Sequence, residues 1–90
     1  MNERIVVREA QAADAEVLTG LSAELGYPSS PQAVADRLER VLADGEQCVL
    51  VACLPDGAAV GWIHVFVALR IESDPFAEIG GFVVSEDFRG

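Results

Sequence analysis

Two ionisable side chains in the second half of the chain are candidates for proton transfer. Glu78 lies within the apolar run Ala77–Val84, and His64 lies between the aromatic residues Trp62 and Phe66. Burial raises the pKa of a carboxyl group toward neutrality, so Glu78 is the better candidate for the general base. Histidines change charge between pH 5 and 8, so His64 is a candidate to assist it. A plainer interpretation stays open for each. Glu78 then faces solvent at the mouth of a hairpin, and His64 is a packed, hydrogen-bonded core residue.

Main-chain chemistry is indicated at the end of the same run. The β-branched and aromatic residues of Ala77–Val84 predict a buried central strand, which an acidic turn and the pair Arg89-Gly90 follow. A strand that leads into a glycine-bearing loop is typical of a phosphate-binding helix N-terminus, where free N–H groups face an anion. Within the run, Gly80-Gly81 indicates a bulge or a close backbone approach, or else relief of crowding under a helix.

The two cysteines, Cys48 and Cys53, are five residues apart in one predicted strand. This odd spacing places them on opposite faces, so neither a mutual disulfide nor a shared metal site is expected. We interpret them as small apolar residues in a reducing compartment. Asn2 to Arg4 follow Met1 without a basic and apolar leader, which makes the cytoplasm the expected location. No apolar run is long enough to span a membrane.

The charge pattern limits the class of partner. The formal net charge is -9, and all six basic residues are scattered arginines. Nucleic-acid binding needs clustered cations that displace counterions, so the sequence argues against a nucleic-acid partner. An acidic surface attracts a cationic substrate such as an amine, or it serves solubility alone, and both interpretations stay open.

The elements that position these residues follow from local patterns. Residues 4–8 predict a strand, and a helix follows with Asp14 in its first turn and Gly26 just past its end. A second helix begins with Ser30 as N-cap and Pro31 at its first position, and ends at residues 44–45. Each helix carries one apolar stripe that requires a covering surface.

Three strands complete the chain. We predict strands over residues 47–54, 60–69 and 75–84, joined by a tight turn at Pro55-Asp56-Gly57 and a polar loop over residues 70–74. The predicted class is therefore α+β, in the order β-α-α-β-β-β, with an antiparallel meander and two helices packed on the sheet. Ninety residues make one domain at most, or part of one, so we expect residues 1–90 to form a single, partial domain.

The ordered set of these features resembles the N-terminal half of a GNAT-type (Gcn5-related) N-acetyltransferase. The residues that carry the resemblance are Ile5–Ala10 with Asp14, Leu25–Pro28 before Pro31 and Arg37-Leu38, Val60-Gly61-Trp62, and Val83–Gly90. In this family the fourth strand leads into an acetyl-CoA pyrophosphate loop, written Gln/Arg-x-x-Gly-x-Gly/Ala. Here the chain ends after the second loop position. Both motif glycines, the helix behind them, the later strands and the tyrosine that often protonates the leaving thiolate are therefore absent.

The resemblance implies roles for particular residues. Main-chain groups of Phe82, Val83 and Val84 would pair with the pantetheine arm, and a backbone N–H near Val83 would polarise the thioester carbonyl. Arg89 and Gly90 would begin the phosphate cradle. The acceptor side would be lined by Tyr27, Pro28, Ser29 and Ser30, which are otherwise a plain helix connector.

The functional prediction is an acetyl-CoA-dependent N-acetyltransferase that acts on an amine of a small molecule or protein, without a metal and without a membrane partner. This truncated portion is expected to be inactive alone. An open edge of the last strand, Ala77–Val84, predicts a dimer or larger oligomer. The alternative is a complete, non-enzymatic α+β module for dimerisation or binding.

Overall fold

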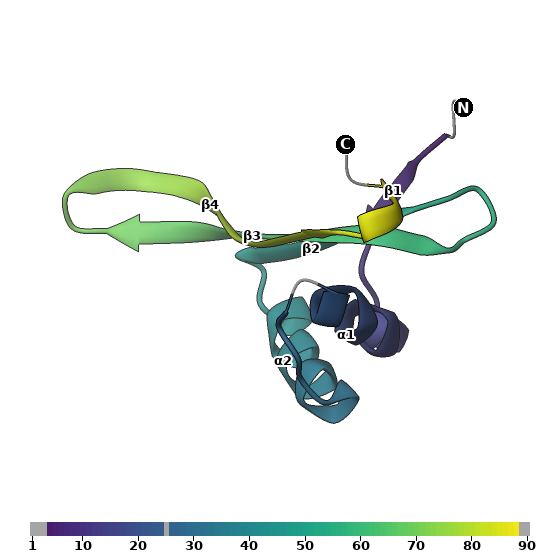
Figure 1. The fold of residues 1–90 in the computed structure, drawn as a ribbon. Coiled ribbons are helices and arrows are strands. Elements are labelled where there is room, and N and C mark those ends of the chain that lie inside the picture. Colours follow the sequence, from purple (N-terminus) through teal and green to yellow (C-terminus); the bar gives the residue numbers. More distant parts are fainter. Residues whose placement is uncertain (1–3, 25, 89–90) are drawn as a thin grey trace.

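Four strands form one antiparallel sheet whose spatial order follows the sequence, β1-β2-β3-β4 (Figure 1). The computed structural model describes residues 4–24 and 26–88. The elements are β1 Val6–Glu9, α1 Ala15–Glu24, α2 Pro31–Ala43, β2 Gln47–Cys53, β3 Ala59–Arg70 and β4 Ser73–Val84, with 3₁₀ turns at Ala12–Asp14 and Glu86–Phe88. The predicted α+β class, element order and antiparallel meander are confirmed.

Both α-helices pack on one face of the sheet, and the hydrophobic core lies between the two layers (Figure 1). Leu18 of α1 and Leu38 of α2 belong to one buried cluster with Val49 and Val51 of β2. Burying a side chain of this size stabilises the fold by about 1.5–3 kcal/mol. In the apolar stripe of α2, Leu38 is buried, whereas Leu42 is exposed near the end of the helix.

The helix boundaries follow the capping signals of the sequence. Gly26 has a φ of 86°, and the N–H groups of Gly26 and Tyr27 donate to carbonyls in the last turns of α1. This is a Schellman motif, which requires a left-handed residue that glycine adopts without strain. At the start of α2, Ser30 Oγ accepts a hydrogen bond of 3.1 Å from the N–H of Ala33, and Pro31 follows the cap. The predicted connection between the helices is confirmed.

The hairpin of β3 and β4 is longer than predicted and extends beyond the helices (Figure 1). Arg70 pairs with Ser73 across a two-residue turn, so most of the loop predicted over residues 70–74 is strand. Near this tip, Arg70 donates to Glu78 at 2.8 Å and its guanidinium lies 5.2 Å from the centre of the Phe76 ring. These contacts tie the two strands together outside the core.

The predicted buried, central position of Ala77–Val84 is wrong. In the described part of the chain β4 has β3 on one side and no strand on the other. Ile79 and Phe82 are 61% and 62% exposed, whereas Val83 is 4% exposed. An apolar run has the same appearance in the sequence whether its two faces are covered or one is left open, so the pattern did not distinguish the two cases.

Neither α1 nor α2 covers the opposite face of the sheet. Register places Leu50, Ile63 and Phe82 side by side on that face, and Val7 and Ile79 share it. Val7, Ile79 and Phe82 are all well exposed. In a complete domain, an apolar face of a sheet is normally buried against another layer. In the described residues, this face is instead an exposed apolar patch.

The remaining sequence expectations concern cysteines and membranes. Both cysteines lie in β2 and both thiols are free. Cys48 is half-buried, and Cys53 is buried in the hydrophobic core. No group of three or more metal-ligating side chains is found within residues 4–24 and 26–88. Across the same residues, no helix is long and apolar enough to cross a membrane.

Candidate functional site

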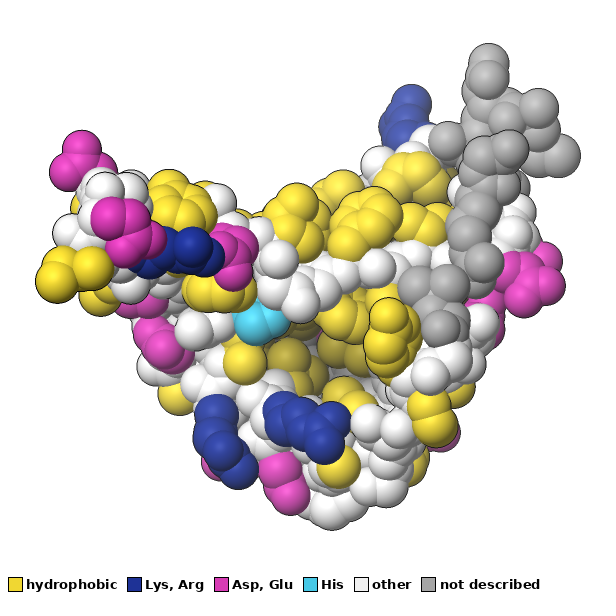
Figure 2. Space-filling model, turned by 60° about the vertical axis from the view of Figure 1, so that its left-hand side comes forward, with side chains coloured by type: hydrophobic (Ala, Val, Ile, Leu, Met, Phe, Trp, Pro, Cys, Tyr) yellow, Lys and Arg dark blue, Asp and Glu magenta, His cyan; other side chains and the backbone are white. Residues whose placement is uncertain are grey.

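A cavity of about 620 Å³ lies between the two helices and the strands β2, β3 and β4. We call it the helix–sheet cavity. Figure 2 shows it as a hollow with mostly hydrophobic walls. Its size lies in the range of small-molecule sites. The described residues that line it are Leu18, Ser22, Tyr27, Ser29, Val34, Arg37, Leu38, Val41, Val49, Trp62, His64, Gly80, Gly81, Phe82 and Val83.

A bulge in β4 shapes the sheet wall of the cavity. Val65 pairs with Ile79 and His64 pairs with Gly81, so Gly80 is an extra residue in the ladder. A Cβ atom on Gly81 would lie 2.8 Å from the Trp62 ring, and one on Gly80 would lie 3.0 Å from His64 Nδ1. The bulge predicted for Gly80-Gly81 is therefore confirmed, and side chains, not another backbone, closely approach both glycines. The crowding comes from side chains of β3 and not from a helix.

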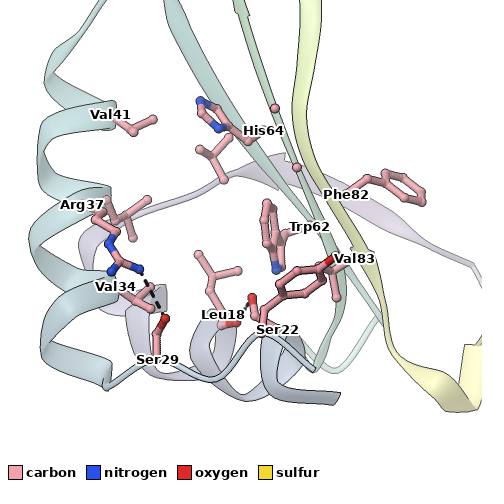
Figure 3. A pocket seen from close by; sticks show the side chains of 15 residues that line it. Leu18, Ser22, Ser29, Val34, Arg37, Val41, Trp62, His64, Phe82 and Val83 are labelled. Atoms are coloured by element: carbon pink, nitrogen blue, oxygen red, sulfur yellow. Dashed lines mark hydrogen bonds between the residues drawn. The ribbon is translucent and has the colours of Figure 1, made fainter. Parts of the chain in front are cut away.

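His64 lies on the cavity wall, where Figure 3 shows its ring on the same side of the sheet as Trp62. Its Nε2 is 2.6 Å from Oε1 of Gln47. Because a carbonyl oxygen accepts, Nε2 carries the hydrogen in this pair, and Nδ1 of the neutral ring keeps its lone pair. The ring also stacks at a tilt on Phe66, with centroids 5.7 Å apart. His64 is thus both packed and hydrogen-bonded, and it borders a cavity.

Glu78 does not line the helix–sheet cavity. Its Oε1 accepts a hydrogen bond of 2.8 Å from Nη2 of Arg70, and both side chains are substantially exposed. This ion pair belongs to the outer part of the hairpin, as the solvent-facing interpretation expects. The structure therefore brings His64 to the cavity and leaves Glu78 outside it.

The connector between the helices contributes unevenly to the cavity. Tyr27 and Ser29 line it, whereas Pro28 and Ser30 do not, and Ser30 instead caps α2. From α2, Arg37 Nη1 donates to Ser29 Oγ at 3.3 Å, and Figure 3 shows this contact at the helix side of the cavity. No site role for Arg37 was predicted from the sequence.

The end of β4 has one open edge. Ser85 N–H donates to the carbonyl of Val60 at 2.7 Å. Two residues further along each strand, Trp62 of β3 pairs with Val83 of β4. Hydrogen-bonded pairs alternate along an antiparallel ladder, so the main-chain groups of Val83 face β3 and those of Phe82 face the open edge. Val84 is the last residue of the strand. The predicted positions Arg89 and Gly90 lie outside the described residues.

Arg8 and Asp14 form a bidentate ion pair that the sequence reasoning missed. Both guanidinium–carboxylate contacts are 2.8 Å, and Asp14 also accepts from the N–H of Gln11 at 2.7 Å. The hydrogen bonds from Arg8, more than the opposing effect of burial, lower the pKa of Asp14 below its usual range. The pair links β1 to the 3₁₀ turn that precedes α1. Arg8 and Asp14 are six residues apart, which is wider than the spacing of ion pairs within one helix, so the sequence alone did not predict the contact.

Comparisons with known proteins place this architecture. No protein-family model matches the sequence, and no curated protein matches it. Solved structures do match. A GNAT family acetyltransferase from Staphylococcus aureus has a TM-score of 0.80 and 22% identity, over 94% of this chain and 65% of that one. An aminoglycoside 6′-N-acetyltransferase from Acinetobacter baumannii has a TM-score of 0.81 and 11% identity, over 94% and 60%. The fold is that of the GNAT acetyltransferases.

A third solved structure with the GNAT fold is an aminoglycoside N-acetyltransferase in complex with CoA. It has a TM-score of 0.79 and 20% identity, over 99% of this chain and 60% of that one. The chain therefore spans less than two thirds of the length of these three structures. The resemblance inferred from the sequence, to the N-terminal half of the GNAT fold, is confirmed at the level of the fold.

Proposed function

We propose that this chain is the N-terminal portion of an acetyl-CoA-dependent N-acetyltransferase that acts on the amine of a small molecule or protein. The observation that carries the proposal is a juxtaposition. The open edge of β4 at Phe82 borders a cavity that His64 lines, in a fold that this chain shares with solved acetyltransferases. One of those relatives was solved with CoA.

The described residues fit two steps of the reaction: binding of the cofactor by main-chain groups and polarisation of the thioester carbonyl. Acetyl-CoA supplies an acetyl group as a thioester, which an amine attacks with formation of a C–N bond and loss of the thiolate. The open edge at Phe82 binds an extended chain in the manner of an added strand, and its N–H is the donor available to a carbonyl oxygen there. His64 Nδ1 is the acceptor for the amine proton, because Nε2 is engaged with Gln47. Glu78 is the weaker candidate base, because it pairs with Arg70 outside the cavity.

Residues 1–90 form one partial domain in this proposal, and a segment beyond Gly90 completes the phosphate cradle that Arg89 and Gly90 begin. The isolated chain is therefore inactive. Two free cysteines suit a reducing compartment, and we assign the protein to the cytoplasm. The second candidate function is a dimerisation or binding module. The uncovered apolar face of the sheet is the observation that favours it.

The reading frame and an activity assay separate the two candidates. We expect the frame to continue past Gly90 with a Gly-x-Gly segment and an amphipathic helix. Protein made from that longer frame is expected to release thiol from acetyl-CoA in the presence of amines, whereas the 90-residue chain releases none above background. A stop codon directly after Gly90, or a longer protein that releases no thiol with any amine tested, would contradict the transferase and favour the binding module.

A further inference from the structure

The helix–sheet cavity carries a charge opposite to that of the whole molecule. The chain has 15 acidic residues and a net charge of -9. Yet none of the described residues that line the cavity is Asp or Glu, and Arg37 is the fully charged residue among them. A ligand with several positive charges finds no counter-charge in this lining. A ligand with a negative group does find one.

Arg37 is placed to receive such a group. Its guanidinium projects from α2 and donates to the Ser29 hydroxyl at 3.3 Å, which leaves other N–H groups of its fork for a ligand. No ion pair joins Arg37 to a carboxylate among residues 4–24 and 26–88. A guanidinium fork matches the two oxygens of a carboxylate, and the pairing is stronger than a neutral hydrogen bond.

Trp62 supplies a second donor without a partner. Its indole Nε1 is buried and has no hydrogen-bond partner in the described part of the chain. Trp62 lines the cavity, and Figure 3 shows the indole between the helix side and the strand side. Because an indole N–H only donates, and a buried unpaired donor is costly, it favours a ligand that brings an oxygen acceptor.

The rest of the lining is apolar. Leu18, Val34 and Val41 form the helix side, and Val49 and Val83 form the sheet side. These walls favour a compact hydrocarbon body on the ligand, since burial of apolar surface drives binding. Together with the two donors they define a ligand with an apolar body and an acidic group.

We propose that the helix–sheet cavity binds an amine that carries both an apolar body and a carboxylate, as an aliphatic α-amino acid does. The carboxylate binds Arg37 and the hydrocarbon body lies along the apolar walls. The identification of this amine as the acetyl acceptor rests on the proposed function. This ligand class differs from that of the two solved aminoglycoside acetyltransferases that share the fold, whose named substrates are aminoglycosides.

The chain contains its own reporter. Trp62 is the single tryptophan of the chain and lines the cavity. Tryptophan fluorescence, excited at wavelengths that tyrosine does not absorb, therefore reports on ligand binding there. Titrations compare L-leucine with isopentylamine, which has the same hydrocarbon body without the carboxylate, and with the triamine spermidine. We expect L-leucine to bind about tenfold more tightly than isopentylamine, and spermidine to bind no more tightly than isopentylamine.

Two arginine variants test the contact itself. Arg37→Gln is expected to weaken L-leucine binding about tenfold and to leave isopentylamine binding unchanged. Arg40→Gln is the matched control, because Arg40 lies on the same helix and is exposed without lining the cavity, and it should change neither. Circular dichroism confirms that each variant keeps its helices. Equal affinities for the three ligands, an Arg37→Gln variant that binds L-leucine normally, or no emission change at millimolar L-leucine would overturn the proposal.

The readout needs no acetyl-CoA, so this proposal and the proposed function fail separately. Carboxylate-dependent binding in a protein whose longer form releases no thiol leaves the cavity as a binding site without the transferase reaction. Thiol release with spermidine but not with L-leucine would support the transferase function and contradict the proposal that the acceptor is an amine with a carboxylate.

Discussion

At the scale of single residues, we propose His64 as the proton acceptor because it lines the helix–sheet cavity. Its Nε2 is engaged with Gln47 and its Nδ1 faces the bulge of β4 at the cavity wall. In protein made from the longer reading frame that we propose, His64→Ala is expected to lower kcat about 100-fold, because a positioned base typically contributes a factor of 10²–10⁴. The measurement is thiol release under saturating substrates.

Glu78→Gln is the matched comparison for His64. It removes the rival carboxylate, which pairs with Arg70 outside the cavity, and we expect kcat to change less than about threefold. A loss in Glu78→Gln as large as the one in His64→Ala would reverse the assignment of the base.

Asp14 gives a prediction about stability and pH. Its pKa is lowered in the folded chain by hydrogen bonds from Arg8 and Gln11, so the folded state binds protons less readily than the unfolded state. The ion pair therefore stabilises the fold above the ordinary Asp value of about 3.9, and this stabilisation is lost as the pH falls through the lowered folded value. Asp14→Asn is expected to cost about 1–2 kcal/mol of unfolding free energy at pH 7, a modest figure because the Arg8 side chain is 38% exposed.

Urea unfolding of the wild type and Asp14→Asn at a series of pH values measures this effect. The difference between the two should be constant from pH 7 to about pH 4 and should shrink below that. Asp87→Asn, at an exposed position, serves as the control and should show no such dependence. A difference between wild type and Asp14→Asn that persists unchanged at pH 2 would contradict the account.

At the scale of elements, the close contact of β3 and β4 depends on glycine at position 61. A Cβ atom there would lie 2.8 Å from the Val83 carbonyl oxygen, a main-chain atom that moves only with its strand. Gly61→Ala is expected to lower the unfolding free energy by about 2 kcal/mol. Gly20→Ala, in the exposed middle of α1 with nothing within 4 Å of the added atom, should raise it by about 0.5–1 kcal/mol. Thermal unfolding of both variants tests the contrast, and a stable Gly61→Ala variant would show that the strands have room to separate.

Elements set by local signals were predictable from the sequence. Gly26 ends α1 and Ser30 with Pro31 begins α2, because capping depends on residues within one turn. The exposure of β4 was not predictable, because it depends on which layers cover the sheet. The pair of Arg8 with Asp14 and the unpartnered Trp62 Nε1 also required the fold, since each arises where separate elements meet.

At the scale of the whole molecule, an open strand edge and an uncovered apolar sheet face adjoin each other. β4 has no described neighbour on its outer side, and Ile79 and Phe82 stand exposed on the uncovered face. Such edges pair with other chains. We expect light scattering of the 90-residue chain to report a dimer or larger species, and Ile79→Lys to shift it toward the monomer. Val17→Lys, on the exposed side of α1, is the control and should not, and a wild-type chain that is strictly monomeric at high concentration would contradict the prediction.

We propose that this chain holds the strand edge of a coenzyme-A enzyme and only part of its phosphate cradle. Amide chemical shifts of the isotope-labelled 90-residue chain, followed during titration with acetyl-CoA, test both parts together. The account predicts binding weaker than micromolar, with the largest shift changes at Phe82 and its neighbours at the end of β4. Micromolar affinity, or shift changes at millimolar acetyl-CoA that leave the end of β4 unmoved, would contradict it.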